Sequence, residues 1–196
     1  FELGMNDGWA GTQPYAFSDK DLDAHKPFHG TYSLHVPKGD DPKTLAPGEP
    51  GVRRPPGVKG IYPFSRPYYL AKKGRYCVSL YARGGKGAPI SACLQRVSSD
   101  SNAYRNVRVL RRNIKKALVA SGTLDDSWRR FHASGELGAG WYYLSIESPG
   151  PLWVDAVQLE AGAAPTPYAP RAAVEGALRT GQYANIVRDD QRTLTA

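Results

Sequence analysis

The stretch Leu152-Trp153-Val154-Asp155-Ala156-Val157-Gln158-Leu159-Glu160 is the part of the chain that most strongly indicates its fold. It has the composition of a β-strand, with the acidic residue Asp155 set among apolar neighbours. A buried carboxylate is unfavourable unless it is paired or bound to a metal. We therefore expect a cation at Asp155, and the alternative is that its carboxylate only accepts backbone hydrogen bonds.

Composition indicates an all-β domain. The chain has 196 residues, enough for one sizeable domain, and it contains 21 Gly, 16 Pro and 12 Tyr. Short β-like runs alternate with turn signals, which is typical of a sandwich or barrel. No apolar run is long enough to span a bilayer.

The formal net charge is +8, from 26 Lys and Arg against 18 Asp and Glu. A basic surface attracts polyanions such as acidic polysaccharide, nucleic acid or an anionic membrane, and charge alone does not choose among them. The basic residues cluster at Arg53-Arg54, between Arg105 and Lys116, and at Arg129-Arg130. We interpret these clusters as solvated surface, because that is the usual place of Lys and Arg.

Two alternating runs predict a β-hairpin. Residues 76–83 and 87–97 flank the glycine-rich turn Gly84-Gly85-Lys86. A hairpin centred on Gly85 would place Cys77 directly opposite Cys93, so we expect these two residues to be a disulfide candidate. Period-two alternation assigns one set of side chains to the core: Tyr76, Val78, Leu80, Ala82, Ile90, Ala92 and Leu94.

A third run, residues 141–147, alternates in the same way. Tyr142, Leu144 and Ile146 share one face of this strand. The other face carries Trp141, Tyr143, Ser145 and Glu147. Two large aromatic side chains on the face away from the core are unusual for a purely structural strand.

These outward faces give a candidate carbohydrate-binding site. Sugar rings stack on aromatic side chains, and their hydroxyls need hydrogen-bond partners. The mixture of residues that fits this need is Tyr81, Gln95, Arg83, Trp141 and Tyr143. Arg also pairs bidentately with carboxylate and sulfate groups, so we expect a preference for acidic glycans.

Three segments together carry a resemblance to a known class of domain. Phe1-Glu2-Leu3-Gly4, the run Gly30-Thr31-Tyr32-Ser33-Leu34-His35-Val36 and the stretch around Asp155 occur in this order. In this respect residues 1–170 resemble the jelly-roll carbohydrate-binding modules of families four, nine and twenty-two. The resemblance implies an all-β fold, a β-sandwich jelly roll that is galactose-binding-domain-like.

The resemblance also implies a structural calcium shared by the first and last strands. Calcium prefers oxygen ligands, and Glu2 and Asp155 would supply carboxylates. Backbone carbonyls around His25, Lys26, Gly30 and Ser33 would complete the shell. Zinc is not expected, because the four His and two Cys show no zinc-ligand spacing.

The chain changes character after Pro170. Residues 171–196 have no partner pattern left in a jelly roll, so we expect a linker and the start of a following domain. The resemblance implies that such a domain leads to a covalently linked catalytic domain.

The function expected is that of a non-catalytic carbohydrate-binding module that targets a linked glycoside hydrolase or lyase to polysaccharide, outside the cell or in the periplasm. No nucleophile motif or recognisable pair of catalytic acids is present. The alternative is a structural accessory domain without sugar binding. A nucleic-acid partner is not expected, because only charge suggests it and most aromatic residues are assigned to strand cores. A membrane partner is not expected either.

Overall fold

The computed structural model describes residues 9–11, 22–36, 63–65, 68–97, 115–169 and 193–194, and Glu2 and residues 171–192 lie outside these ranges. All regular elements among the described residues are β-strands, as the sequence predicts. No helix that could span a bilayer occurs in this part of the chain.

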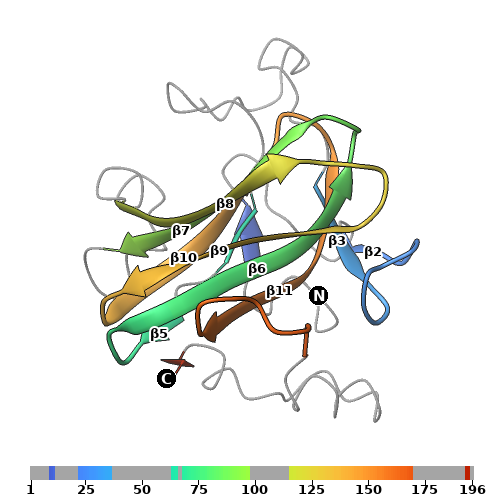
Figure 1. Cartoon of the computed structure of the whole chain (residues 1–196). Coiled ribbons are helices and arrows are strands. Elements are labelled where there is room, and N and C mark those ends of the chain that lie inside the picture. The colour runs from blue at the N-terminus through green and yellow to red at the C-terminus, as the bar shows by residue number, and fades with distance from the viewer. Residues whose placement is uncertain are drawn as a thin grey trace, which may run out of the picture.

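The strands form two sheets that face each other as a sandwich (Figure 1). One sheet, here called sheet B, has the order β2-β3-β11-β6-β9. Its strands are β2 (Leu22–Asp23), β3 (Ser33–Val36), β11 (Leu152–Ala161), β6 (Gly74–Gly84) and β9 (Arg129–Leu137). All of its pairings are antiparallel.

The other sheet, sheet A, is built around β10, which pairs with β7 along its whole length and with β4 and β5 on its other side. Strand β8 pairs with β7, β1 with β4, and β12 runs parallel to β5. The bounds are β1 (Trp9–Gly11), β4 (Pro63–Ser65), β5 (Tyr68–Leu70), β7 (Pro89–Val97), β8 (Lys115–Thr123), β10 (Gly140–Glu147) and β12 (Thr193–Leu194).

The core lies between the two sheets and contains every residue that alternation assigned to it on β6, β7 and β10. Tyr76 and Tyr142 are buried there, and their hydroxyls reach backbone carbonyls, Tyr76 donating to Lys72 (3.0 Å) and Tyr142 to Gly138 (2.9 Å). Each large ring therefore contributes apolar area without leaving a buried hydroxyl unpaired.

The predicted hairpin is wrong. Strand β6 pairs with β9 and β11 in sheet B, whereas β7 pairs with β8 and β10 in sheet A. The turn between them bonds to the neighbouring turn instead of closing a ladder: Gly84 N–H donates to Asp125 and Gly87 N–H donates to Leu124. Residues 84–88 thus form an arch, and the apolar sides of β6 and β7 face each other across the core.

The arch also overturns the disulfide prediction. Cys77 and Cys93 are free and buried, and they lie outside the core cluster, on strands of opposite sheets. Alternation places each on the outward side of its own sheet, with the core between them. Stacked sheets lie about 10 Å apart, beyond the reach of a disulfide.

Candidate functional site

Sheet B carries an arginine between two tryptophan rings on its outer face. Arg83 pairs in register with Trp153, and its guanidinium lies 4.8 Å from the centre of the Trp153 ring and 5.2 Å from that of Trp128. Trp153 also stacks on His35 of β3, with ring centres 4.6 Å apart. The Nε of Arg83 is buried and has no hydrogen-bond partner among the described residues, so the aromatic faces supply most of its surroundings there.

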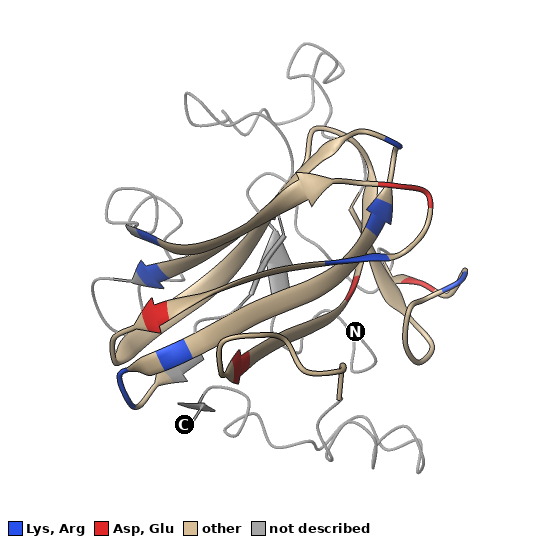
Figure 2. Ribbon diagram, viewed as in Figure 1, with Lys and Arg blue, Asp and Glu red and all other residues tan. Residues whose placement is uncertain are grey.

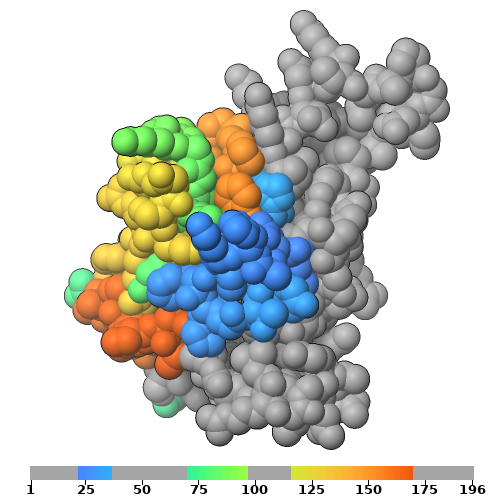
Figure 3. Space-filling model, turned by 90° about the vertical axis from the view of Figure 1, so that its right-hand side faces the viewer, coloured from blue at the N-terminus to red at the C-terminus, as the bar shows by residue number. Residues whose placement is uncertain are grey.

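Residues 23–29, here called the covering loop, close over this cluster. Arg83 donates to the carbonyl of His25 (2.8 Å), and the indole N–H of Trp128 donates to the carbonyl of Lys26 (2.9 Å). The indole N–H of Trp153 donates to Asp23. In Figure 3 the segment 22–36 (blue) covers the middle of this side of the molecule, next to the yellow atoms of the β9 region and the orange-red atoms at the end of β11 and beyond.

Tyr81 lies under the same loop. The ring of Phe28 stacks on it, with centres 3.5 Å apart and planes inclined by 14°, and Phe28 itself is 38% exposed. Arg130 from β9 places its guanidinium 5.5 Å from the Tyr81 ring. Tyr81 and Arg83, two of the predicted sugar-binding residues, are therefore already engaged by the chain's own loop.

The loop is fixed to β11 through Asp155, which is 3% exposed. Its Oδ2 accepts the backbone N–H groups of Phe28 (2.9 Å) and His29 (3.0 Å), and its Oδ1 accepts that of Ala156 (2.7 Å). Burial raises the pKa of this carboxyl, and the three backbone donors offset part of that rise. Ala156 has φ 48° at an irregularity in the β11–β6 register, and this turn of the backbone directs its N–H to the carboxylate.

The residues predicted to hold calcium are only partly brought together. Asp155 accepts from His29, and the next residue, Gly30, has φ 69°. The hydroxyl of Ser33 faces the carbonyl of Asp23 at 3.3 Å, and Glu2 lies outside the described residues. Within the described ranges, no three Asp, Glu, His or Cys side chains gather as a metal-binding group.

The outer face of sheet A carries a buried polar group. Tyr143 of β10 donates its hydroxyl to Gln95 Oε1 (3.0 Å), and Gln95 Nε2 donates to Ser145 Oγ (2.6 Å). The three side chains, here called the polar ladder, are each at most 7% exposed. They point away from the core, because Leu94, Tyr142 and Leu144 alternate with them and lie inside it.

The strand register extends this face in both directions. Gln95 pairs with Lys116 of β8 and with Tyr143 of β10. Toward the other end of the strands, Ser91 pairs with Ser121 and with Glu147. Trp141 stands one step beyond Tyr143 on the same face and is half-buried. On this face Lys116 and Ser121 are exposed, and Ser91, Glu147 and Trp141 are half-buried. The polar ladder itself is buried, so it can act on a ligand only by orienting its neighbours.

The structure thus divides the predicted sugar site between two faces. Gln95, Trp141 and Tyr143 belong to the outer face of sheet A, whereas Tyr81 and Arg83 belong to that of sheet B. The predicted hairpin had placed Tyr81 and Gln95 on one face, and the arch separates them. Alternation had already placed Ser145 and Glu147 beside Tyr143, but Lys116 could not be assigned to this face from sequence.

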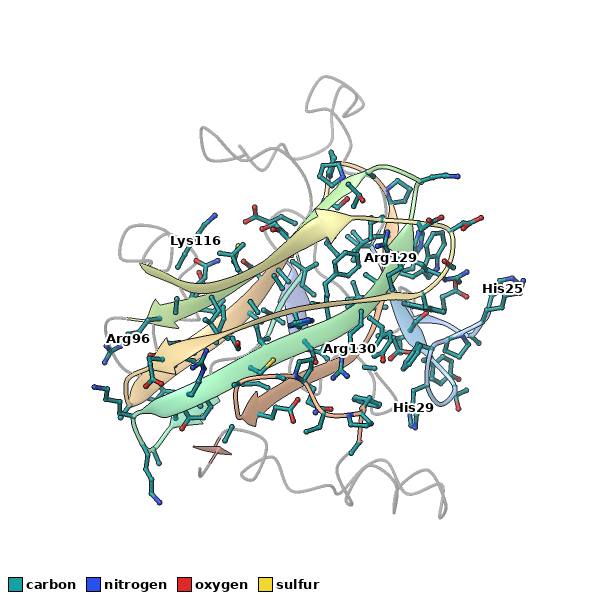
Figure 4. All side chains as sticks on the ribbon, viewed as in Figure 1. His25, His29, Arg96, Lys116, Arg129 and Arg130 are labelled. Atoms are coloured by element: carbon teal, nitrogen blue, oxygen red, sulfur yellow. The ribbon has the colours of Figure 1, made fainter. Side chains whose placement is uncertain are left out.

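Among the residues that the structure describes, Lys and Arg do not form one continuous patch. Figure 2 shows Lys and Arg at separate places on the strands, interspersed with acidic residues. In Figure 4, Arg96 and Lys116 lie at the end of the sandwich opposite to His25 and His29, while Arg129 and Arg130 lie on β9. Of the predicted basic clusters, Arg53-Arg54 and the stretch from Arg105 to Arg112 lie outside the described residues. Arg129 is exposed, as expected for solvated surface, whereas Arg130 is half-buried against Tyr81.

Comparison with solved structures shows the same fold. The tandem CBM22-1–CBM22-2 domains of Xyn10C from Paenibacillus barcinonensis align with a TM-score of 0.54 and 16% identity, over 88% of this chain and 46% of theirs. The CBM22-1–GH10 modules of endo-1,4-β-D-xylanase 10B from Clostridium thermocellum, complexed with xylohexaose, align with a TM-score of 0.51 and 15% identity, over 88% and 29%. No protein-family model and no curated protein sequence matches the chain.

The chain accordingly spans less than half of either protein. At this level of identity the similarity concerns the fold, which is the β-sandwich of carbohydrate-binding modules, as predicted from the sequence.

Proposed function

We propose that this chain is a non-catalytic carbohydrate-binding module and that its polysaccharide site is the outer face of sheet A. The observation that carries the proposal is the polar ladder of Tyr143, Gln95 and Ser145. Buried side-chain networks on the outward side of a sheet are not needed to form a sandwich core. They do fix the orientation of polar groups that can receive a ligand.

The face supplies both interactions that a sugar chain requires. The ring of Trp141 offers a stacking surface, and the groups of Ser91, Ser121 and Glu147 can hydrogen-bond to hydroxyls. Because the ladder holds its members in place, less rotamer entropy is lost on binding than for free side chains. An extended polysaccharide could lie across the strands and contact several rows of the register.

The biological role follows from tethering. A weak and reversible grip on a polymer raises the local substrate concentration for a linked catalytic domain. The similar structures support this role, since one contains xylanase modules and was solved with xylohexaose. A covalently linked glycoside hydrolase or lyase, and a location outside the cell or in the periplasm, are parts of the proposal.

A structural calcium at Asp155 is also proposed. A carboxylate that is nearly fully buried and whose pKa burial raises would be stabilised by a cation. Oδ1 accepts one hydrogen bond among the described residues and so retains acceptor capacity. The carbonyls of His25 and Lys26 already accept hydrogen bonds, so Asp155 and carbonyls nearer Gly30 and Ser33 are the candidate ligands.

The site is tested by changing Gln95, whose amide joins the other two members of the ladder. Gln95→Ala should weaken binding to xylan in affinity electrophoresis by about ten-fold, because Tyr143 and Ser145 lose the partner that holds them and the binding face is no longer ordered before the ligand arrives. Trp141→Ala should weaken it by a similar amount through the loss of stacking.

Glu136→Gln is the control, since Glu136 is an exposed residue of β9 in the other sheet. All three proteins should show similar far-UV circular dichroism. Unchanged binding of the Gln95 and Trp141 variants to every polymer that the parent retards would contradict the assignment. A parent that no neutral or acidic polysaccharide retards would contradict the function itself and favour a structural accessory domain.

A further inference from the structure

Strand β8 contains a bulge that changes the direction of Lys116. Leu118 pairs with Leu94, but the next pair along the strands is Lys116 with Gln95, so Ala117 is an extra residue. Leu118 lies in the core, and Ala117 also packs against it. In a regular strand Lys116 would point the same way as Leu118, into the core. The bulge turns it outward, and it is exposed.

Lys116, which the bulge turns outward, lies at the end of the polar ladder. Residues directly opposite in an antiparallel pair have Cβ atoms about 4.5–5.5 Å apart. Lys116 is opposite Gln95, and Gln95 bonds to Tyr143 and Ser145. Its ammonium therefore borders a row whose other described members, Gln95 and Tyr143, are uncharged at neutral pH.

Among the described residues, the neighbouring charged side chains of β7 and β10 do not take the place of the Lys116 ammonium. Glu147 lies on the same face but pairs with Ser91, four residues along β7 from Gln95, or about 13 Å at the usual strand rise. Arg96 follows Gln95 and alternates to the other side, where it donates to the carbonyl of Ala139 (2.8 Å). The face is thus polarised, with an ammonium group at one end and a carboxylate at the other.

We propose that Lys116 recognises an anionic group on the bound polysaccharide, so that the ligand is a uronate-containing or sulfated polymer. The proposal rests on the function assigned above and names the substrate class for the same face. A lysine ammonium is a compact charge with three donors on a flexible stem, and it serves a carboxylate or a sulfate ester equally well. Bulges next to binding sites commonly re-aim one side chain in this way.

The experiment compares matched polymers on the full chain. Glucuronoxylan and alginate are each used with their carboxyl-reduced forms, in which the carboxylates have become alcohols, and sulfated xylan forms a separate arm. Affinity electrophoresis is run at low and high salt. Lys116→Gln should reduce the affinity for the anionic polymer about two- to five-fold, the range of an exposed ion pair, and leave binding to the carboxyl-reduced form unchanged.

Arg129→Gln provides the control, because Arg129 is an exposed cation on β9 in the other sheet and its change alters the net charge equally. The difference between the Lys116 variant and the parent should shrink at high salt, since screening weakens exposed pairs. A Lys116-dependent preference confined to glucuronoxylan or alginate identifies the carboxylate, and one confined to sulfated xylan identifies the sulfate ester.

Two results would overturn the inference while leaving the proposed function intact. One is equal affinity of the parent for an acidic polymer and its reduced form, in every arm. The other is an equal loss in the Lys116 and Arg129 variants, which would assign the effect to diffuse charge. If no polymer binds at all, the proposed function fails as well.

Discussion

Asp155 holds the covering loop to β11, because its carboxylate accepts hydrogen bonds from backbone N–H groups. Asp155→Asn should lower the free energy of unfolding by about 1–3 kcal/mol, because the amide nitrogen of Asn would face N–H donors that need an acceptor. Urea unfolding of the parent and the variant measures this.

The same residue predicts a pH dependence. Burial raises its pKa above the ordinary value of 3.8, so the folded state binds this proton more tightly than the unfolded state. Its contribution to stability is fully present below pH 3.8 and is lost as pH rises through the folded pKa. The stability gap between parent and Asp155→Asn should therefore narrow as pH rises.

The calcium proposal predicts a dependence of stability on added metal. Added calcium should raise the melting temperature of the parent by mass action, and a chelator should lower it, while Asp155→Asn should respond to neither. If the parent melts at the same temperature with added calcium and with a chelator, the calcium proposal is wrong. The three hydrogen bonds are then the whole role of Asp155.

Gly84 begins the arch between the sheets and has no room for a side chain. A Cβ there would lie 2.8 Å from the carbonyl oxygen of Pro151 and 2.9 Å from Cδ1 of Leu124. Because the first of these atoms is backbone, Gly84→Ala should lower the free energy of unfolding by about 1–3 kcal/mol.

The neighbouring Gly85 is the matched control, since nothing lies within 4 Å of its Cβ position. Gly85→Ala should leave stability unchanged or raise it slightly, because it restricts the unfolded chain. Chemical denaturation of the two variants separates them, and equal losses would mean that the arch is not packed as described.

The covering loop is the element that distinguishes the two faces of the sandwich. Its hold on sheet B combines the Phe28–Tyr81 stack with backbone contacts to Asp155, Arg83 and Trp128. Phe28→Ala should remove the stack, worth about 0.5–1.5 kcal/mol, and speed hydrogen exchange at the backbone amides of residues 28 and 29.

His25→Ala is the control for this loop, because His25 is exposed and the carbonyl that accepts from Arg83 is kept. Exchange at both amides should then stay close to the parent. Polysaccharide binding should be unaffected in either variant, since the proposed site lies on sheet A. Unaltered exchange in Phe28→Ala would show that backbone contacts alone hold the loop.

Sequence periodicity predicted which side chains of β6, β7 and β10 face the core, and it did so because alternation depends only on the local backbone. It could not decide which strands pair. A glycine-rich turn permits either a hairpin or an arch, and the choice depends on the 124–125 turn, some forty residues away, which bonds to Gly84 and Gly87.

The candidate site was predictable in part for the same reason. Trp141, Tyr143 and Gln95 face outward by simple alternation, and the sequence identifies them. The outward direction of Lys116 depends on a bulge against β7, and the covering of Tyr81 depends on Phe28, 53 positions earlier. Neither feature can be recognised from neighbouring residues in the sequence. The sequence therefore suggests that Tyr81 and Arg83 are open to a ligand, although the covering loop contacts both.

At the scale of the whole molecule, the two outer faces have different roles. Sheet A presents the polar ladder and its flanking groups, and sheet B presents an aromatic and arginine cluster that the chain itself covers. Figure 1 shows the long strands of the two sheets as separate layers. The described core cluster between them consists of aliphatic and aromatic side chains, and its two tyrosine hydroxyls bond to backbone carbonyls of Lys72 and Gly138.

This separation predicts that Tyr81 and Gln95 act independently. If both residues belonged to one sugar site, as the predicted hairpin implied, their effects on binding would be coupled. Because they lie on opposite faces of a core about 10 Å thick, the effects of Tyr81→Phe and Gln95→Ala on the free energy of binding and of unfolding should add to within about 0.5 kcal/mol.

The measurement is a double-mutant cycle on xylan binding and urea unfolding, with Tyr143→Phe replacing Tyr81→Phe as the positive control. Tyr143 donates its hydroxyl to Gln95, so the Tyr143 and Gln95 changes should be non-additive by roughly 0.5 kcal/mol or more. Coupling between Tyr81 and Gln95 as large as that of the control would mean that one ligand contacts both faces, which the sandwich does not allow. We expect the Tyr81 and Gln95 effects to add and the Tyr143 and Gln95 effects to be coupled. That result would place the binding energy on sheet A and leave Tyr81 as a support for the covering loop.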